Sequence, residues 1–188
     1  MKSVLISIRP KWTEKIANGE KTIEVRKSAP KEVPFKCYIY ETQGQYVKFT
    51  HGAHTKYGYG RGKVIGAFIC DRIEMVNAKC SNYGIDLFYH DCLTNGCLTE
   101  REIEKYFNVP EDRDLRAMKG NGYVWNISDL KIYDKPKELS EFCIPCKVSC
   151  ENCKNPLYFE CWCEEKGKKI VTRPPQSWCY VENLGEEE

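Results

Sequence analysis

The start of the chain changes from a two-residue to a helical period of apolar residues, which predicts a strand and then a short helix. In "SVLISIRP", Val4, Ile6 and Ile8 fall on one face of an extended chain, an alternation typical of a β-strand. Pro10 suits the first turn of a helix over "KWTEKIAN". Gly19 then supplies the left-handed residue that commonly ends a helix.

The strand period returns in "KTIEVRK", where one face is apolar and the other is charged. Ile23 and Val25 face one way, and Glu24 and Arg26 project from the other face, roughly 6.5 to 7 Å apart at Cα. We expect this charged face to be accessible, with Lys21 leaning over it from the preceding turn. Such a group can bind a phosphate, a carboxylate or a polar base edge. The alternative is a solvated sheet face with weak ion pairs.

The next segments predict a third strand, a loop and a central strand. The sequence "FKCYIYET" reads as the third strand, and "QGQYVKFTHGAHTKYGYGRG" is rich in Gly, Tyr, His and Lys, which indicates a long, partly mobile loop. The apolar run "KVIGAFICDRIEMV" contains many β-branched and aromatic residues. It predicts one strand long and apolar enough to be central in a sheet.

The rest of the main pattern predicts one more helix and several short strands. In "LTEREIEKYF", Thr99 and Glu102 have the spacing of a capping box, and Ile103, Tyr106 and Phe107 form an apolar stripe. The segments "NGYVWNISDLKIYDKP" and "SWCYV" read as strands. About six strands with two or three helices predict an α+β domain, built on a small mixed β-barrel or curled sheet over residues 1–142 and 168–184.

Composition adds limits on class and compartment. At 188 residues, one main domain is expected. Lys and Arg number 29 against 27 Asp and Glu, so only a local basic patch can point to nucleic acid. The first apolar run, Val4 to Ile8, is too short for a signal peptide or a membrane span. We therefore expect a cytoplasmic protein with no membrane partner, in which the twelve cysteines do not form a disulfide framework.

A cluster of six cysteines in "CIPCKVSCENCKNPLYFECWC" predicts a separate small module over residues 143–167. Zinc takes four thiolate or imidazole ligands, and each C-x2-C turn supplies two of them. We expect one structural Zn²⁺ held by four of the pool; the alternative is six free thiols. The pool is Cys143, Cys146, Cys150, Cys153, Cys161 and Cys163. The acidic tail, residues 185–188, is expected to be disordered.

Several of these segments resemble the ASCH domain family, which has a PUA-like β-barrel. They are "ISIRPKWTEKIANGEKTIEVRK", "GKVIGAFICDRI" and "YVWNISDLKIYDKP". The family pattern G-x-K-x-x-x-x-R is matched by Gly19, Lys21 and Arg26. The resemblance runs from the first strand to about Pro136, and "RPPQSWCYVE" is similar to members from bacterial and prophage genomes. It leaves out the cysteine module.

The resemblance implies a cleft that is lined by Lys21 and Arg26 and binds RNA or a nucleotide. It also implies a second hypothesis, because some ASCH proteins are amidohydrolases that remove the acetyl group from N4-acetylcytidine. Those enzymes pair the lysine with a threonine nucleophile, at the position where this chain has Glu24. A carboxylate nucleophile would form a mixed anhydride, so Glu24 would serve as a general base or hold Lys21 in place. A third hypothesis is that the cleft meets a protein partner.

An RNA site also needs flat rings for stacking and cations for phosphates. Lys11 and Trp12 begin the first helix, although packing on the sheet is the more expected role of Trp12. A loop offers two aromatic and two basic residues for binding, or is a plain exposed loop: Tyr57, Tyr59, Arg61 and Lys63. Trp178 and Tyr180 follow "TRPPQ", where we expect Trp178 to be buried at the end of the sheet.

Overall fold

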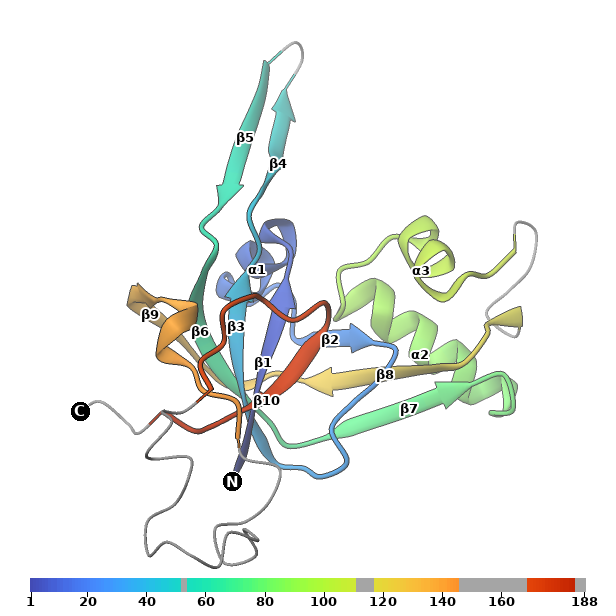
Figure 1. Cartoon of the computed structure of the whole chain (residues 1–188). Coiled ribbons are helices and arrows are strands. Elements are labelled where there is room, and N and C mark those ends of the chain that lie inside the picture. The colour runs from blue at the N-terminus through green and yellow to red at the C-terminus, as the bar shows by residue number, and fades with distance from the viewer. Residues whose placement is uncertain (52–53, 111–116, 146–168, 185–188) are drawn as a thin grey trace, which may run out of the picture.

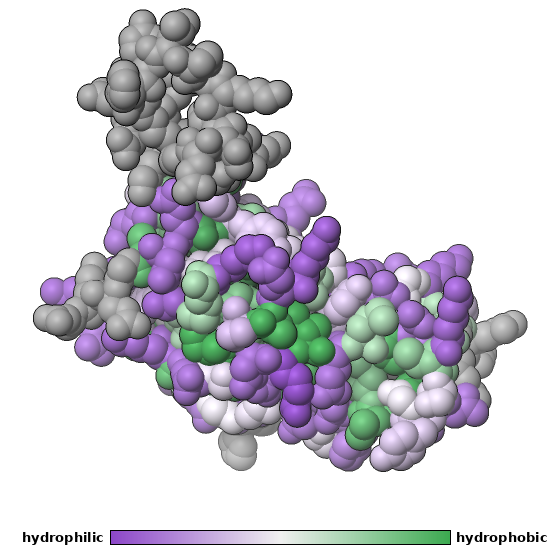
Figure 2. Space-filling view, turned by 90° about the horizontal axis from the view of Figure 1, so that it is seen from below, coloured by the Kyte–Doolittle hydropathy of each residue, from purple (hydrophilic) through white to green (hydrophobic). Residues whose placement is uncertain are grey.

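The structure is a computed structural model that describes residues 1–51, 54–110, 117–145 and 169–184. Across these ranges the chain forms ten β-strands and three α-helices, arranged around two sheets and a projecting hairpin (Figure 1). Seen from below, hydrophilic residues surround a smaller apolar area (Figure 2). None of the helices in these ranges is long and apolar enough to cross a membrane.

The larger sheet has five strands and mixed direction. Strands β1 and β3 are parallel neighbours, and the other neighbouring strands are antiparallel. The order is β10 (Trp178–Val181), β1 (Lys2–Ile8), β3 (Phe35–Glu41), β6 (Lys63–Cys70) and β9 (Ser128–Lys137). A 3-10 turn, Leu139–Glu141, follows β9. The sheet buries the alternating residues Val4, Ile6 and Ile8 in one cluster, as the sequence pattern predicts.

The smaller sheet contains β2 (Ile23–Arg26), β8 (Asn121–Asn126) and β7 (Ile73–Asn77), in that order. Two helices form a second core with it (Figure 1): α2 (Asn82–Thr94) and α3 (Glu100–Phe107). Ile23 and Val25 face this second core. The opposite face of the small sheet turns toward the larger sheet, and Trp125 of β8 packs in the larger sheet's core.

The first helix, α1 (Pro10–Ala17), forms where the sequence predicts it. Proline occupies its first turn, and Ile16 is fully buried against the larger sheet. The helix ends at Ala17 with Asn18 as its C-cap, and Gly19 follows with φ +75°, a conformation that costs glycine little because it has no Cβ. The chain then turns directly into β2. The predicted helix at Glu100–Phe107 also forms, with a complete capping box between Thr99 and Glu102.

Two predictions about the middle of the chain are wrong. The segment expected to be a mobile loop is a hairpin of β4 (Gly44–His51) and β5 (His54–Gly60). Its residues have high β-propensity, but no core covers them to give an apolar alternation. The expected single central strand is two strands, β6 and β7, in different sheets. The polar pair Asp71 and Arg72 lies between them, and the chain changes sheets there.

The predicted α+β class is confirmed, and the chain has three helices where two or three were expected. No closed barrel forms in the described ranges, because the edge strands β9 and β10 do not pair with each other. An unpredicted helix, α2, buries Ile85, Phe88 and Cys92, at spacings of three and four residues. Its sequence mixes these positions with exposed aromatic residues such as Tyr83, which hides the apolar stripe.

The cysteine-rich segment lies largely outside the described residues. The half-buried Cys143 is described, and the other five cysteines of the predicted zinc site are in residues 146–168. Among described residues there is no cluster of three or more metal-ligating side chains. Zinc binding, the limits of the module and the disorder of residues 185–188 therefore stay predictions.

Candidate functional site

The three charged residues predicted as the centre of the site are together, but they are buried. Lys21, Glu24 and Arg26 are 3%, 6% and 9% exposed. The expectation of an accessible charged strand face is therefore wrong. The face of β2 that carries Glu24 and Arg26 turns toward the larger sheet, so it lies between two layers. We call these three residues the charge cluster.

Glu24 lies between the two cations of the charge cluster. Its Oε2 is 3.5 Å from Lys21 Nζ, and its Oε1 is 3.0 Å from Arg26 Nη2. Lys21 Nζ also donates a hydrogen bond of 2.8 Å to the Gly96 carbonyl, and Arg26 Nη2 donates one of 2.7 Å to the Ser7 carbonyl. Two cations share one carboxylate, which leaves one positive charge unmatched within the cluster.

One donor of the charge cluster is unused. Arg26 Nε is buried and has no hydrogen-bond partner in the described part of the chain. An unsatisfied buried donor costs roughly 1 to 3 kcal/mol, and native proteins leave few such groups. Together with the unmatched charge, this donor suits the cluster to a ligand that brings an acceptor or a negative charge.

Aromatic side chains from two helices lie next to the charge cluster. Lys21 Nζ is 5.5 Å from the centre of the Trp12 ring of α1, and Lys11 Nζ is 4.2 Å from it. Trp12 also packs on the larger core, as expected. Tyr106 of α3 is close enough to the cluster to interact with its charges. The pKa of its hydroxyl is raised, mainly by burial; Arg26 lowers this pKa and Glu24 raises it.

The segment before β10 forms a third side of the site. Ser7, whose carbonyl binds Arg26, donates its N–H to Ser177 at 2.9 Å and its hydroxyl to the Pro175 carbonyl at 2.6 Å. Trp178 is half-buried and packs against Trp125. Its Nε1 donates to Ser28 at 3.1 Å, two residues beyond β2. The site is thus bordered by α1, α3 and the chain around Pro175 to Trp178.

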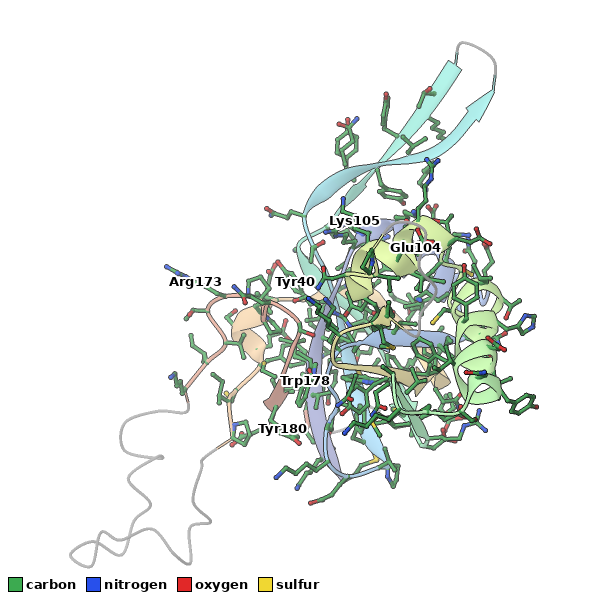
Figure 3. The ribbon with its side chains drawn as sticks, turned by 90° about the vertical axis from the view of Figure 1, so that its right-hand side faces the viewer. Tyr40, Glu104, Lys105, Arg173, Trp178 and Tyr180 are labelled. Carbon is green, nitrogen blue, oxygen red and sulfur yellow. The ribbon has the colours of Figure 1, made fainter. Side chains whose placement is uncertain are left out.

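Three exposed cations lie on or next to the segments that border the charge cluster. In Figure 3, Lys105 of α3 and Arg173 of the C-terminal segment lie on either side of Tyr40, and both are exposed. Lys27, also exposed, has its Nζ 5.0 Å from the centre of the Tyr106 ring. We call Lys27, Lys105 and Arg173 the rim. Sequence reasoning missed Tyr106, Lys105 and Arg173, because their role depends on how α3 and the C-terminal segment fold over β2.

Of the five further residues predicted to bind RNA, Lys11 lies beside the charge cluster, over the same Trp12 ring as Lys21, and the other four lie elsewhere. Lys11 Nζ pairs with Glu102 at the start of α3, so it connects α1 with α3. In contrast, Tyr57, Tyr59 and Arg61 line a separate concavity of about 520 Å³, together with Thr13 and Ala17 on another face of α1. Lys63 Nζ is 2.6 Å from Glu138 Oε1. The predicted binding residues therefore do not form one region, and Lys63 lies outside both the charge cluster and the concavity.

Comparisons with known proteins identify the fold. No protein-family model matches the sequence, and no curated protein matches it. Among solved structures, the crystal structure of ASCH from Zymomonas mobilis matches with a TM-score of 0.53 and 16% identity over 96% of this chain and 88% of that chain. Two mutant structures of the same protein also match at 16% identity. The first has a TM-score of 0.53 over 97% of this chain and 91% of that chain. The second has a TM-score of 0.54 over 96% of this chain and 89% of that chain. The chain therefore has an ASCH-like fold, as its sequence resemblance implied.

Proposed function

We propose, starting from the ASCH-like fold, that this protein binds RNA and holds one of its nucleotides at the charge cluster. The observation that carries the proposal is the buried pair of cations sharing a single carboxylate, with Arg26 Nε unused among the described residues. A carboxylate beside a guanidinium offers an acceptor and donors to the polar edge of a base.

The surroundings of the charge cluster fit the other parts of a nucleotide. Single-stranded RNA is commonly recognised by stacking unpaired bases on aromatic rings and by contacts to phosphates. Trp12 and Tyr106 lie beside the cluster and neither is fully buried, so they are the candidates for stacking. The rim supplies three exposed cations for phosphates of the same RNA segment.

The test substitutes the three rim residues, because exposed side chains can be changed without disturbing the core. The triple variant Lys27→Ala, Lys105→Ala and Arg173→Ala should weaken binding to a single-stranded RNA of about 12 nucleotides. Each lost phosphate contact lowers the salt slope of log K by about 0.7, so the slope should fall by about 2. Fluorescence anisotropy at several salt concentrations measures both effects.

A matched control removes the same charge elsewhere. Lys31, Lys79 and Lys119 are exposed cations outside the rim, and their triple alanine variant should keep the wild-type salt slope. Equal losses in the two triple variants would mean that only net charge matters, and would remove the rim from the proposal.

A second candidate function is hydrolysis of a modified nucleoside or of RNA. The observation that favours it is the buried contact between Lys21 Nζ and Glu24 Oε2 at 3.5 Å, since an ammonium beside a carboxylate can act as an acid–base pair. Release of acetate and cytidine from N4-acetylcytidine, lost in Lys21→Met, would support it. No turnover by wild-type protein at high enzyme concentration would exclude this substrate.

A further inference from the structure

The β4–β5 hairpin presents a surface that is separate from the charge cluster. The two strands pair with each other in their own sheet, and the hairpin projects beyond α1, away from β2 (Figure 1). A two-stranded hairpin alone is marginally stable in water. Its exposed aromatic residues, Tyr57 and Tyr59, are not part of a hydrophobic core, so core packing does not explain them.

One face of the hairpin presents large exposed side chains. Val47 is directly opposite Tyr57, and Gln45 is opposite Tyr59, so these four residues share one face. Val47, Tyr57 and Tyr59 are 53%, 48% and 71% exposed. Adjacent exposed apolar and aromatic residues of this kind commonly mark an interaction site. We call these four residues the ribbon face.

Contacts with the body fix the direction of the ribbon face. Lys48 Nζ is 2.6 Å from Glu14 Oε1 of α1, and this hydrogen-bonded pairing lowers the pKa of the Glu14 carboxyl. At the root, a Cβ on Gly60 would lie 1.9 Å from the Thr42 carbonyl oxygen, so glycine allows the strand to approach closely. The hairpin is therefore held against α1, and its two tyrosines remain exposed.

Cations accompany the two tyrosines. Lys56 and Arg61 are exposed, and both line the concavity at the root of the hairpin with Tyr57 and Tyr59. The backbone N–H of Arg61, directly after β5, donates to Glu41 Oε1 at 2.9 Å, which holds the end of the hairpin in place. Aromatic rings interleaved with cations suit single-stranded nucleic acid, because unpaired bases expose their faces for stacking. A duplex keeps those faces covered.

We propose that the ribbon face binds unpaired nucleotides of the same RNA whose other nucleotide occupies the charge cluster. This inference rests on the proposed function and makes its ligand a single-stranded RNA rather than a free nucleotide. The charge cluster and the ribbon face lie on different faces of α1, so one RNA chain would pass along that helix. Tyr57 and Tyr59 stack on bases, while Lys56 and Arg61 contact phosphates.

The experiment compares RNA binding by the double variant Tyr57→Ala and Tyr59→Ala with wild type. Stacking on an aromatic ring is strong enough that the affinity for a single-stranded RNA of about 12 nucleotides should fall at least ~10-fold. The double variant Tyr57→Phe and Tyr59→Phe keeps the rings and should bind like wild type. The control Tyr83→Ala removes an exposed tyrosine of α2, with an exposed fraction of 77%, and should leave the affinity unchanged.

The outcomes separate this inference from the proposed function. Unchanged affinity in the double alanine variant, with weakened binding in the rim variant, would overturn the ribbon face alone. The reverse pattern would overturn the charge cluster and keep the ribbon face as an RNA-binding surface. Stacking would be contradicted if the double alanine variant lost as much affinity for a fully paired RNA duplex as for single-stranded RNA. It would also be contradicted if the phenylalanine variant lost as much affinity as the alanine variant. No RNA binding by wild type would overturn both.

Discussion

Glu24 is the carboxylate on which the two buried cations of the charge cluster depend. It contacts Lys21 at 3.5 Å and Arg26 at 3.0 Å, and all three residues are largely buried. The sequence predicted the three residues and their proximity, because side chains two apart on a strand share a face. It could not predict their burial, since periodicity does not say what covers the polar face.

Neutralising this carboxylate should destabilise the fold. In Glu24→Gln the two cations stay buried without their counter-charge, and breaking a buried pair in this way costs about 3–5 kcal/mol. Urea unfolding followed by circular dichroism measures the loss. The control, Glu20→Gln, removes a carboxylate in an exposed pair with Lys15 and should leave the unfolding midpoint nearly unchanged. Similar midpoints in both variants would contradict a structural role for Glu24.

Buried thiols should make the protein sensitive to alkaline pH. Burial raises the pKa of Cys92 from 9.0 to about 12, so the folded state keeps a proton that the unfolded state loses. This contribution to stability is complete below pH 9 and is lost as the pH rises toward about 12.

A serine variant isolates the effect of the thiol. Between pH 8 and pH 10.5, Cys92 should account for about 2 kcal/mol of lost unfolding free energy. Cys92→Ser does not titrate in this range, so it should lose less stability than wild type over the same interval. Equal pH dependence in urea unfolding of the two proteins would show that Cys92 contributes nothing.

At the scale of elements, the sequence was most informative where local signals and burial agree. The helix α1 has proline at its start and glycine beyond its end, and α3 has its capping box. The hairpin was missed because it packs against little besides α1, so no apolar alternation marks it. The change of sheet between β6 and β7 was missed because both strands are apolar, and periodicity does not record which sheet a strand joins.

The capping box of α3 matters because this helix carries Tyr106 and Lys105 to the site. Glu102 N–H donates to Thr99 Oγ1 at 3.3 Å, and Thr99 N–H donates to Glu102 Oε2 at 3.0 Å. Thr99→Ala should cost about 1 kcal/mol of unfolding free energy, and Thr99→Ser should cost much less. Thermal or urea unfolding measures both, and an equal loss in the two variants would mean that the hydroxyl is not the cap.

At the scale of the molecule, the described ends of the cysteine-rich segment are joined by backbone hydrogen bonds. Ile144 N–H donates to the Lys169 carbonyl at 2.8 Å, and Val171 N–H donates to the Phe142 carbonyl at 2.8 Å. Cys143 and Ile170 form a β-bridge. The segment between them thus begins and ends at one place on the fold, which is a favourable geometry for an insertion.

Replacing residues 146–168 with a short Gly-Ser linker should therefore leave the rest of the protein folded. The expected result is a thermal midpoint and a circular dichroism spectrum close to those of wild type, because the paired residues on either side remain. Loss of cooperative unfolding in this variant would show that the segment is part of the main core.

The same deletion bears on the zinc prediction. Metal analysis of the wild-type protein should find about one zinc per chain, and Cys150→Ser with Cys153→Ser should lose it, because a structural site needs all four ligands. The deletion variant should contain none. A metal-free wild-type protein would refute the prediction without affecting the account of the charge cluster.

The central claim is that RNA lies against the charge cluster, and ultraviolet cross-linking with mass spectrometry tests it most directly. Single-stranded RNA bound to wild-type protein should cross-link to peptides that contain Trp12 or Tyr106, the aromatic residues beside Lys21 and Arg26. Cross-links confined to other surfaces, such as Tyr83 of α2, with none at Trp12 or Tyr106, would contradict the claim.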